Sequence, residues 1–168
     1  MPIEKTVLSL RAIECLLNRH YGLPFVNAES IPRGTANCYR IDTGEADLFL
    51  KEYPSWTKVG NVRQEGSLIQ YLNQHSFPVS ILMHTLSGEY YCVFEDHILS
   101  VQRFIHGKTY SDHDLPDDLL MDSAELLGKM HALLQDYNLP VDMSSEWIRG
   151  FDLRASLKTH FPTNQETW

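Results

Sequence analysis

The sequence predicts an α+β domain built around an antiparallel sheet, and two observations support this. Runs with alternating apolar residues lie at about 28–33, 37–42 and 47–53, and only short turns around Gly34 and Gly44 separate them. Longer stretches with the period of a helix come before and after these runs. Because short turns make consecutive strands antiparallel neighbours, the pattern favours an α+β sheet over a doubly wound parallel one.

One amphipathic helix is expected before these strands and another after them. In residues 6–21, apolar side chains recur every three or four positions, and Gly22 followed by Pro24 ends the pattern. The helical period returns over residues 57–75. The first three strands therefore connect two helices along the chain.

Further strands and one long helix are expected in the second half of the chain. The strand-like runs lie at residues 79–85, 90–94 and 98–105. Pro116 then opens a long helical pattern that ends near residue 138. This pattern places several residues on one stripe of the helix, which is mainly apolar. The stripe consists of Leu120, Ala124, Leu127, His131 and Leu134.

Composition argues against several classes of function. Fourteen basic and twenty-two acidic residues give a net charge of −8, whereas a protein that relies on phosphate-backbone contacts usually carries a basic excess. No apolar run reaches membrane-spanning length, and the first ten residues lack the uninterrupted apolar core of a signal peptide. Three widely spaced cysteines suit a reducing compartment. We therefore expect a cytoplasmic protein that binds neither nucleic acid nor membrane.

Metal chemistry is not indicated by the usual ligand patterns. The three cysteines lack the close spacing of a zinc site. None of the eight histidines forms a pair with convincing ligand spacing inside one predicted element. Histidines at the surface or satisfied in the core are the better interpretation, so no metal ligand is assigned.

Residues Gly107-Lys108-Thr109 match the end of a phosphate-binding Walker loop, but the rest of that loop is missing. The loop needs another glycine five residues before Gly107, and Gln102 occupies that position. The run also follows a predicted antiparallel strand and does not open directly into a helix. A plain turn after a strand is the better interpretation.

Lys51 is unusual because it lies inside one of the most strand-like runs of the chain. In DLFLKEY, residues 47–53, the two leucines point to one face, and Lys51 shares the other face with Phe49 and Tyr53. A cation placed on an apolar surface calls for an anion nearby. The question is which residue supplies it.

Glu65 is the candidate partner of Lys51. Its carboxylate projects along the apolar stripe of the helix predicted over residues 57–75, one connection downstream of Lys51. If the two form a buried ion pair, truncating either member typically costs about 3–5 kcal/mol, because the other charge is stranded. The alternative is that both side chains reach solvent separately, and spacing alone does not decide between them.

The turn Gly34-Thr35-Ala36-Asn37 adds a third element. Its small residues can bring backbone N–H groups close to a phosphate. A glycine turn, a lysine on the third strand and a glutamate on the next helix make up, in this order, the nucleotide-clamping half of a kinase. A lone glycine turn is usually only a turn, but the ordered triple is more specific.

With these residues the sequence resembles the aminoglycoside phosphotransferase and choline kinase-like superfamily, which has a protein kinase-like fold. The likeness spans about residues 20–138, and the run at 126–134 resembles the first long helix of the family's carboxyl lobe. The segments that carry it are SIPRGTANCYRIDTG, LFLKEY, RQEGSLIQYLNQH, SVQRFIHGKTY and LLGKMHALL.

The resemblance implies how the chain is organised. Residues 1–26 would form an N-terminal helix and its connection. Residues 27–105 would form the kinase-like amino lobe, an antiparallel sheet with one packed helix that binds the nucleotide. Residues 106–168 would form the hinge and the beginning of an incomplete helical carboxyl lobe.

The resemblance also implies roles for individual residues in binding ATP. A flexible loop would lie over the phosphates, Lys51 would hold the α- and β-phosphates, and Glu65 would fix the position of Lys51. Arg103 and Ile105 would offer hinge backbone groups to the adenine edge, with Gln102 at the back of that pocket. The loop would consist of Gly34, Thr35, Ala36 and Asn37.

The family pattern breaks off after the long helix. Complete family kinases carry an H-G-D-x-x-x-x-N loop there, with a catalytic Asp, an Asn that binds magnesium and a later Asp as second metal ligand. After Leu134 this chain has only Asp136, Asp142 and Asp152, and neither Asp142 nor Asp152 has that motif around it. No catalytic residue or magnesium ligand is therefore assigned, and the chain is expected to be inactive alone, as a fragment, a truncated gene product or half of a split enzyme.

Three possibilities remain open at the level of the sequence. The chain is either the ATP-binding part of a small-molecule kinase or a non-catalytic, kinase-like interaction module. In both cases the helix at 117–137 offers an apolar stripe for self-association or for a missing carboxyl lobe. A third possibility is an unrelated α+β domain. The acceptor substrate cannot be read from these residues.

Overall fold

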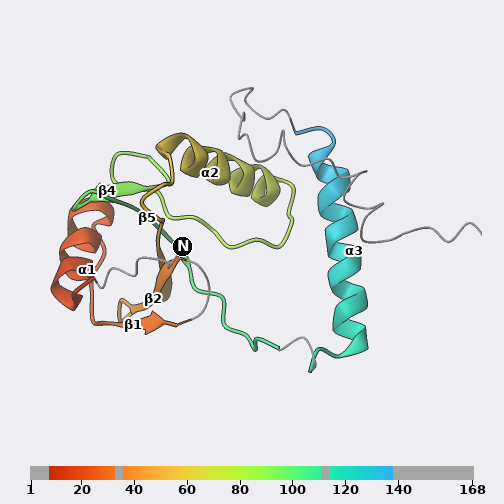
Figure 1. Ribbon diagram of the computed structural model, residues 1–168, viewed down its shortest axis with the longest axis horizontal. Helices are drawn as coiled ribbons and strands as arrows, with labels where there is room; N and C mark the ends of the chain where they lie inside the picture. Colours follow the sequence, from red (N-terminus) through yellow and green to blue (C-terminus); the bar gives the residue numbers. More distant parts are fainter. Residues whose placement is uncertain (1–7, 33–35, 111–113, 138–168) are drawn as a thin grey trace, which may run out of the picture. The chain divides into compact units, whose positions relative to one another are not determined.

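The computed structural model describes residues 8–32, 36–110 and 114–137, and its strands form one five-stranded antiparallel sheet (Figure 1). The strand order in the sheet is β1-β2-β3-β5-β4, and every pair of neighbours is antiparallel. The predicted α+β class is confirmed. In chain order the elements are α1 (Leu10–Leu16), the π-helical turn η1 (Leu17–Tyr21), β1 (Asn27–Ile31), β2 (Asn37–Asp42), β3 (Asp47–Glu52), α2 (Val59–Gln74), β4 (Cys92–Phe94), β5 (His97–Arg103) and α3 (Asp117–Leu134).

The hydrophobic core lies between α1–η1 and one face of the sheet. The helix begins where the Ser9 hydroxyl oxygen accepts a hydrogen bond from the N–H of Ala12 at 3.1 Å, and it ends at Gly22, whose left-handed φ of 65° suits glycine. The α1 residues Ile13 and Leu16 are fully buried. Their partners in the same core come from β2, β3, β4 and β5 and include Tyr39, Ile41, Leu48, Leu50, Cys92, Leu99 and Val101.

The turn between β2 and β3 fixes which side chains of β3 face this core. The Thr43 hydroxyl donates to the carbonyl of Ala46 at 2.8 Å and accepts from the N–H of Ala46 at 3.0 Å. Gly44 takes a φ of 81°, which a side chain would disfavour. The turn thereby sets Asp42 opposite Asp47. Because side chains alternate along a strand, this register directs Leu48 and Leu50 to the core and Lys51 to the opposite face.

The predicted strand at 79–85 is wrong as a regular strand. Only Ile81 to Met83 run along β5: the N–H of Met83 donates to Val101 at 2.8 Å, and the carbonyl of Ile81 accepts from Arg103 at 2.9 Å. Between them Leu82 forms an isolated bridge with Gln102. This bridge lies on the same edge of β5 as β4, which pairs with the first residues of β5. It is too short to count as a sixth strand.

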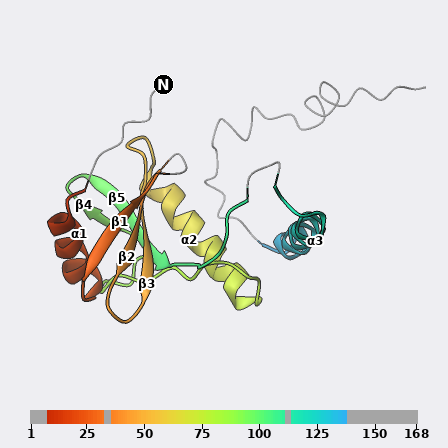
Figure 2. The ribbon, with the colours of Figure 1, turned by 90° about the horizontal axis from the view of Figure 1, so that it is seen from below.

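Helix α2 lies on the opposite side of the sheet from α1, as Figure 2 shows. It is held against the segment just before β4. Arg63 pairs with Glu89 at 3.1 Å, and the Tyr90 hydroxyl donates to the side chain of Gln70. Between these contacts the Tyr90 ring lies directly on Gly66, where an added Cβ would come within 2.5 Å of a ring carbon. The glycine therefore permits this close approach.

Helix α3 confirms the predicted long helix, but none of its residues is buried. Of its expected stripe, Leu120 and Leu127 are exposed. Near its end, the Tyr71 hydroxyl of α2 donates to the carbonyl of Leu133 at 2.9 Å. Within the described parts of the chain, no helix is both long and apolar enough to cross a membrane.

The contact between Gly66 and Tyr90 generates a first prediction. Gly66→Ala should lower the free energy of unfolding by about 1–2 kcal/mol, because the overlap with Tyr90 outweighs the gain in helix propensity. Urea unfolding followed by circular dichroism measures this change. Gly60→Ala is the matched control, since Gly60 lies in the same helix with open space around it. In a Tyr90→Ala background, Gly66→Ala should become neutral or stabilising; an equal loss in both backgrounds would contradict the contact.

The three cysteines generate a second prediction. Cys15 is exposed, whereas Cys38 and Cys92 are buried and none is in a disulfide. Burial raises the pKa of Cys92 to about 11, so very little of this thiol is ionised at pH 8. A short iodoacetamide treatment of the native protein should therefore modify Cys15 alone, as counted by mass spectrometry. All three should react in urea, and rapid native labelling of Cys92 would contradict this core.

Candidate functional site

Lys51 and Glu65 form an ion pair on the outer face, the sheet face that points away from α1. The Lys51 Nζ lies 2.8 Å from Glu65 Oε1. The predicted pairing is confirmed, and separate solvation of the two side chains is not seen. The side chains keep 28% and 39% of their surface, however, so the pair is not buried as expected. Because water screens such pairs, its contribution to stability is about 0–1 kcal/mol rather than the cost expected for a buried pair.

Tyr53 completes the surroundings of Lys51. The Lys51 Nζ lies 4.3 Å from the centre of the Tyr53 ring, and the Tyr53 hydroxyl accepts a hydrogen bond from Ser100 at 3.3 Å. Burial raises the pKa of Tyr53 well above its usual range, and the nearby carboxylate of Glu65 raises it further. Tyr53 therefore stays neutral at physiological pH and offers Lys51 the face of a fixed ring.

The register of the sheet lays out the rest of the outer face. Cys38 and Ser100 flank Lys51 on β2 and β5. Burial raises the pKa of Cys38, and the charge of Lys51 partly opposes this. Phe49 lies on the same face of β3, two residues before Lys51, and is half-buried. Gln102 of β5 lies opposite it. The outer face thus carries an aromatic ring next to the lysine.

The predicted phosphate loop is only partly described. Gly34 and Thr35 lie outside the described residues, and Ala36 forms a bend just before β2. The Asn37 side chain does not join Lys51: its Nδ2 donates to Glu52 Oε2 at 3.2 Å, on the opposite face of the sheet. Glu52 keeps only 3% of its surface and also contacts His97 Nδ1 at 2.9 Å.

The predicted hinge residues follow the end of β5. The backbone of Arg103 is already engaged, because its N–H donates to Ile81 at 2.9 Å and its carbonyl accepts from the Ser80 hydroxyl at 2.8 Å. Ile105 is exposed and lies beyond the last strand, and no described residue hydrogen-bonds to its backbone. Gln102 lies on the outer face, opposite Phe49; its place at the back of an adenine pocket stays a prediction. Of the three, Ile105 has the backbone groups most open to a ligand.

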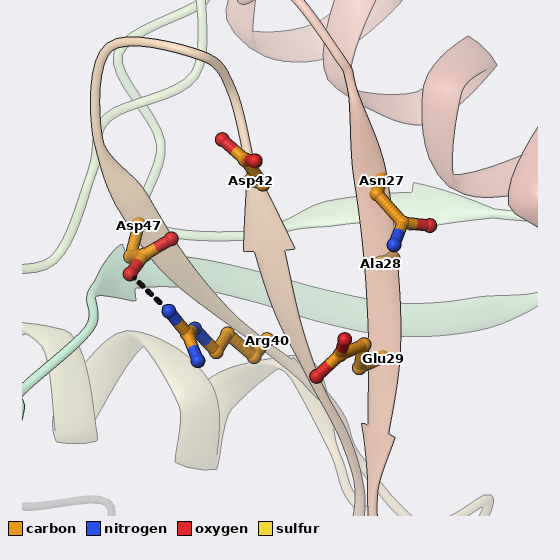
Figure 3. Close-up of a pocket in the computed structure, with 6 residues that line it drawn as sticks. All are labelled: Asn27, Ala28, Glu29, Arg40, Asp42 and Asp47. Atoms are coloured by element: carbon orange, nitrogen blue, oxygen red, sulfur yellow. Dashed lines mark hydrogen bonds and ion pairs between the residues drawn. The ribbon is translucent and has the colours of Figure 1, made fainter.

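Sequence reasoning missed a charged cluster further along the same face. Arg40 Nη2 donates to Asp47 Oδ2 at 2.7 Å, and His106 Nε2 lies 3.1 Å from the same oxygen. The bond to Asp47 and its charge raise the pKa of Arg40. The available signal was the alternation of β3, which places Asp47, Phe49 and Lys51 on one face. The cluster borders a cavity of about 130 Å³, drawn in Figure 3 and lined by Asn27, Ala28, Glu29, Arg40, Asp42 and Asp47.

Metal ligands are not gathered in the part of the chain that the structure describes. No group of three or more His, Cys, Asp or Glu side chains there has the geometry to hold a metal ion. The described residues therefore combine a lysine with its carboxylate partner, two aromatic rings and a free backbone segment. This set can bind an anion and a flat group side by side.

Comparison with solved structures shows the fold. A spectinomycin phosphotransferase in complex with ADP and spectinomycin matches with a TM-score of 0.62 at 18% identity, over 95% of this chain and 54% of that one. An amicoumacin kinase in complex with AMP-PNP, Ca2+ and Ami gives 0.66 at 16% identity, over 77% and 41%. A microcompartment-associated aminopropanol kinase gives 0.65 at 12% identity, over 85% and 47%. This chain thus spans about half the length of each.

Comparison at the level of sequence shows the family. No curated protein sequence gives a significant match. Residues 27–161, by contrast, match the model of the phosphotransferase enzyme family. This match covers most of the 168 residues. The chain therefore belongs to the phosphotransferase enzyme family.

Proposed function

We propose that this chain is the ATP-binding part of a small-molecule phosphotransferase, an enzyme that moves the γ-phosphate of ATP to a substrate hydroxyl. The observation that carries the proposal is the ion pair between Lys51 and Glu65 on the outer face. A lysine held in this way on the third strand by a glutamate of the next helix is the phosphate-holding arrangement of kinases. The family match and the nucleotide complexes of the similar structures support it.

Lys51 is the phosphate ligand in this proposal. Its ammonium group is a compact point charge that can bind α- and β-phosphate oxygens. Glu65 and the ring of Tyr53 limit where the flexible side chain can place this charge. Because more than a quarter of the lysine surface is exposed, a phosphate can approach without displacing protein groups. The turn from Gly34 to Asn37 would supply backbone N–H groups from the other side.

The base of the nucleotide is proposed to lie beside Phe49. This ring is on the same face as Lys51, one step earlier on β3, with Gln102 opposite it. A flat purine can stack on such a ring. The backbone of Ile105 would bind the edge of the purine, because the backbone of Arg103, two residues earlier, is already hydrogen-bonded to Ile81 and Ser80.

Phosphoryl transfer needs more than these residues. It depends on placed metal ions and on a group that orients the acceptor hydroxyl. The printed sequence contains no H-G-D-x-x-x-x-N segment after Leu134, and the described residues hold no cluster of metal ligands. We therefore assign no catalytic residue and propose that this polypeptide alone binds ATP without transferring its phosphate.

The role of Lys51 can be tested by binding. Lys51→Ala should raise the dissociation constant of ATP about tenfold or more, because a charge-assisted contact to the phosphates is lost. The affinity for adenosine should change little. Isothermal titration calorimetry with both ligands measures this, and Lys129→Ala, which removes an exposed lysine paired with Glu125, is the matched control.

Stability separates this role from a structural one. Because the ion pair is partly exposed, Lys51→Ala should cost about 1 kcal/mol or less in urea unfolding. A folded variant with weak ATP binding supports the assignment. Equal ATP titration curves for the wild type and Lys51→Ala, with measurable binding in both, would contradict it.

A second candidate function is a non-catalytic interaction module, and the exposed apolar side chains of α3 favour it. Leu120, Met121 and Leu127 are all exposed. Apolar surface of this kind tends to bind a partner or a second copy of the chain. Light scattering over a range of concentrations should show self-association in the wild type and less of it in Leu120→Glu/Leu127→Glu. A wild-type chain that is monomeric at all concentrations would contradict self-association through α3.

A further inference from the structure

Asp47 connects three segments of the chain on the outer face of the sheet. It is the first residue of β3, and its side chain keeps 18% of its surface. One carboxylate oxygen contacts both Arg40 Nη2 at 2.7 Å and His106 Nε2 at 3.1 Å. Its backbone carbonyl accepts from the N–H of Phe104 at 3.1 Å. One residue thus joins β2, β3 and the segment after β5.

Further contacts extend this connection to the rings of that segment. The guanidinium of Arg40, held by Asp47, lies 5.3 Å from the centre of the Phe104 ring (Figure 3 shows the Arg40–Asp47 bond). The Phe104 and His106 rings meet edge to face at 5.1 Å. A neutral His106 can donate from Nε2 as well as a charged one, so the contact with Asp47 does not require protonation.

The residue between these two anchors is Ile105. Phe104 is anchored through its N–H and ring, and His106 through its imidazole, while Ile105 itself is exposed with no described partner for its backbone. A short segment pinned on both sides keeps the central peptide groups in one orientation. Hydrogen bonds to a ligand depend on such orientation, because a preorganised donor loses less entropy on binding.

We propose that Asp47 is the positioning residue of the base side: through Phe104 and His106 it holds the backbone of Ile105 in place for the edge of a purine. The inference rests on the proposed nucleotide binding and deepens it. Asp47 and Lys51 share one face of one strand and stand four residues apart, roughly 13 Å. Binding of the base and binding of the phosphates would therefore depend on different residues. A substitution at Asp47 or at Lys51 can weaken one of them without the other.

The test measures binding of adenosine, inorganic tripolyphosphate and ATP to the whole chain by calorimetry or by NMR titration. Asp47→Ala should raise the dissociation constant of adenosine about tenfold while changing that of tripolyphosphate by less than about twofold. Lys51→Ala should show the reverse pattern. A merely structural role of Asp47 would weaken both probes together.

Two further variants keep the test decisive. His106→Ala removes an exposed ring and should raise the dissociation constant of adenosine about threefold, so it carries the test if Asp47→Ala does not fold. Glu29→Gln is the matched control: it removes a negative charge opposite Arg40 in the β1–β2 ladder and leaves the Asp47 contacts intact, so adenosine binding should not change.

The outcomes distinguish this inference from the proposed function. If the wild type binds adenosine and ATP but Asp47→Ala and His106→Ala leave adenosine binding unchanged, the role of Asp47 is overturned and nucleotide binding stands. If Asp47→Ala weakens adenosine and tripolyphosphate equally, the positioning role is also overturned. If the wild type binds neither nucleotide nor nucleoside, both the proposed function and this inference fail.

Discussion

The rest of the described structure depends on one constraint: side chains of β3 point alternately to the core and to the outer face of the sheet. β3 is the middle strand of the sheet, paired with β2 on one side and β5 on the other. Its leucines close the core against α1, while Lys51 and Asp47 project from the other face. Neither set can move without the other, because they alternate along one backbone. The packing that stabilises the domain therefore also fixes the charges of the site.

The Lys51–Glu65 pair contributes to geometry more than to stability. A partly exposed pair adds little to the free energy of folding, since the attraction is screened and two long side chains are ordered. What keeps α2 in position is instead packing: the Tyr90 ring lies on Gly66, and Val62 and Leu72 of the helix are buried. The site residues are thus carried by elements that other contacts hold in place, which leaves Lys51 available for a ligand.

Much of the fold could be predicted from the sequence because its signals are local. Periods of two and of 3.6 residues, with glycine at the turns, give the first three strands, both early helices and the long helix. Lys51 and Glu65 were candidate partners, because both are charges on predicted apolar surfaces one connection apart, but their spacing alone left separate solvation open. Their partial exposure could not be predicted, since it depends on how α2 lies against the sheet.

The remaining differences arise from contacts between distant parts of the chain. Whether residues 79–85 form a strand depends on how far they stay beside β5, and they do so only from Ile81 to Met83. The cluster at Asp47 joins Arg40 from β2 with His106 from beyond β5. The alternation of β3 places Asp47 on the outer face, but no local pattern predicts its contact with Arg40 and His106, because an aspartate at the start of a strand is normally solvated. The assigned roles at Gly34 and Thr35 stay predictions, since those residues lie outside the described ranges.

The buried carboxylate of Glu52 has a consequence for the order of folding. It contacts residues from very different points of the chain: Asn37 is close in sequence, on the neighbouring strand, whereas His97 arrives only with β5. The hairpin of β2 and β3 can form from local contacts, but β5 must first close a long loop, which is slow. We expect the part of the sheet in which β5 pairs with β3, around Glu52 and His97, to form last. Because β5 also brings Ser100 and Gln102 to the outer face, the step that completes the sheet is the one that completes the site.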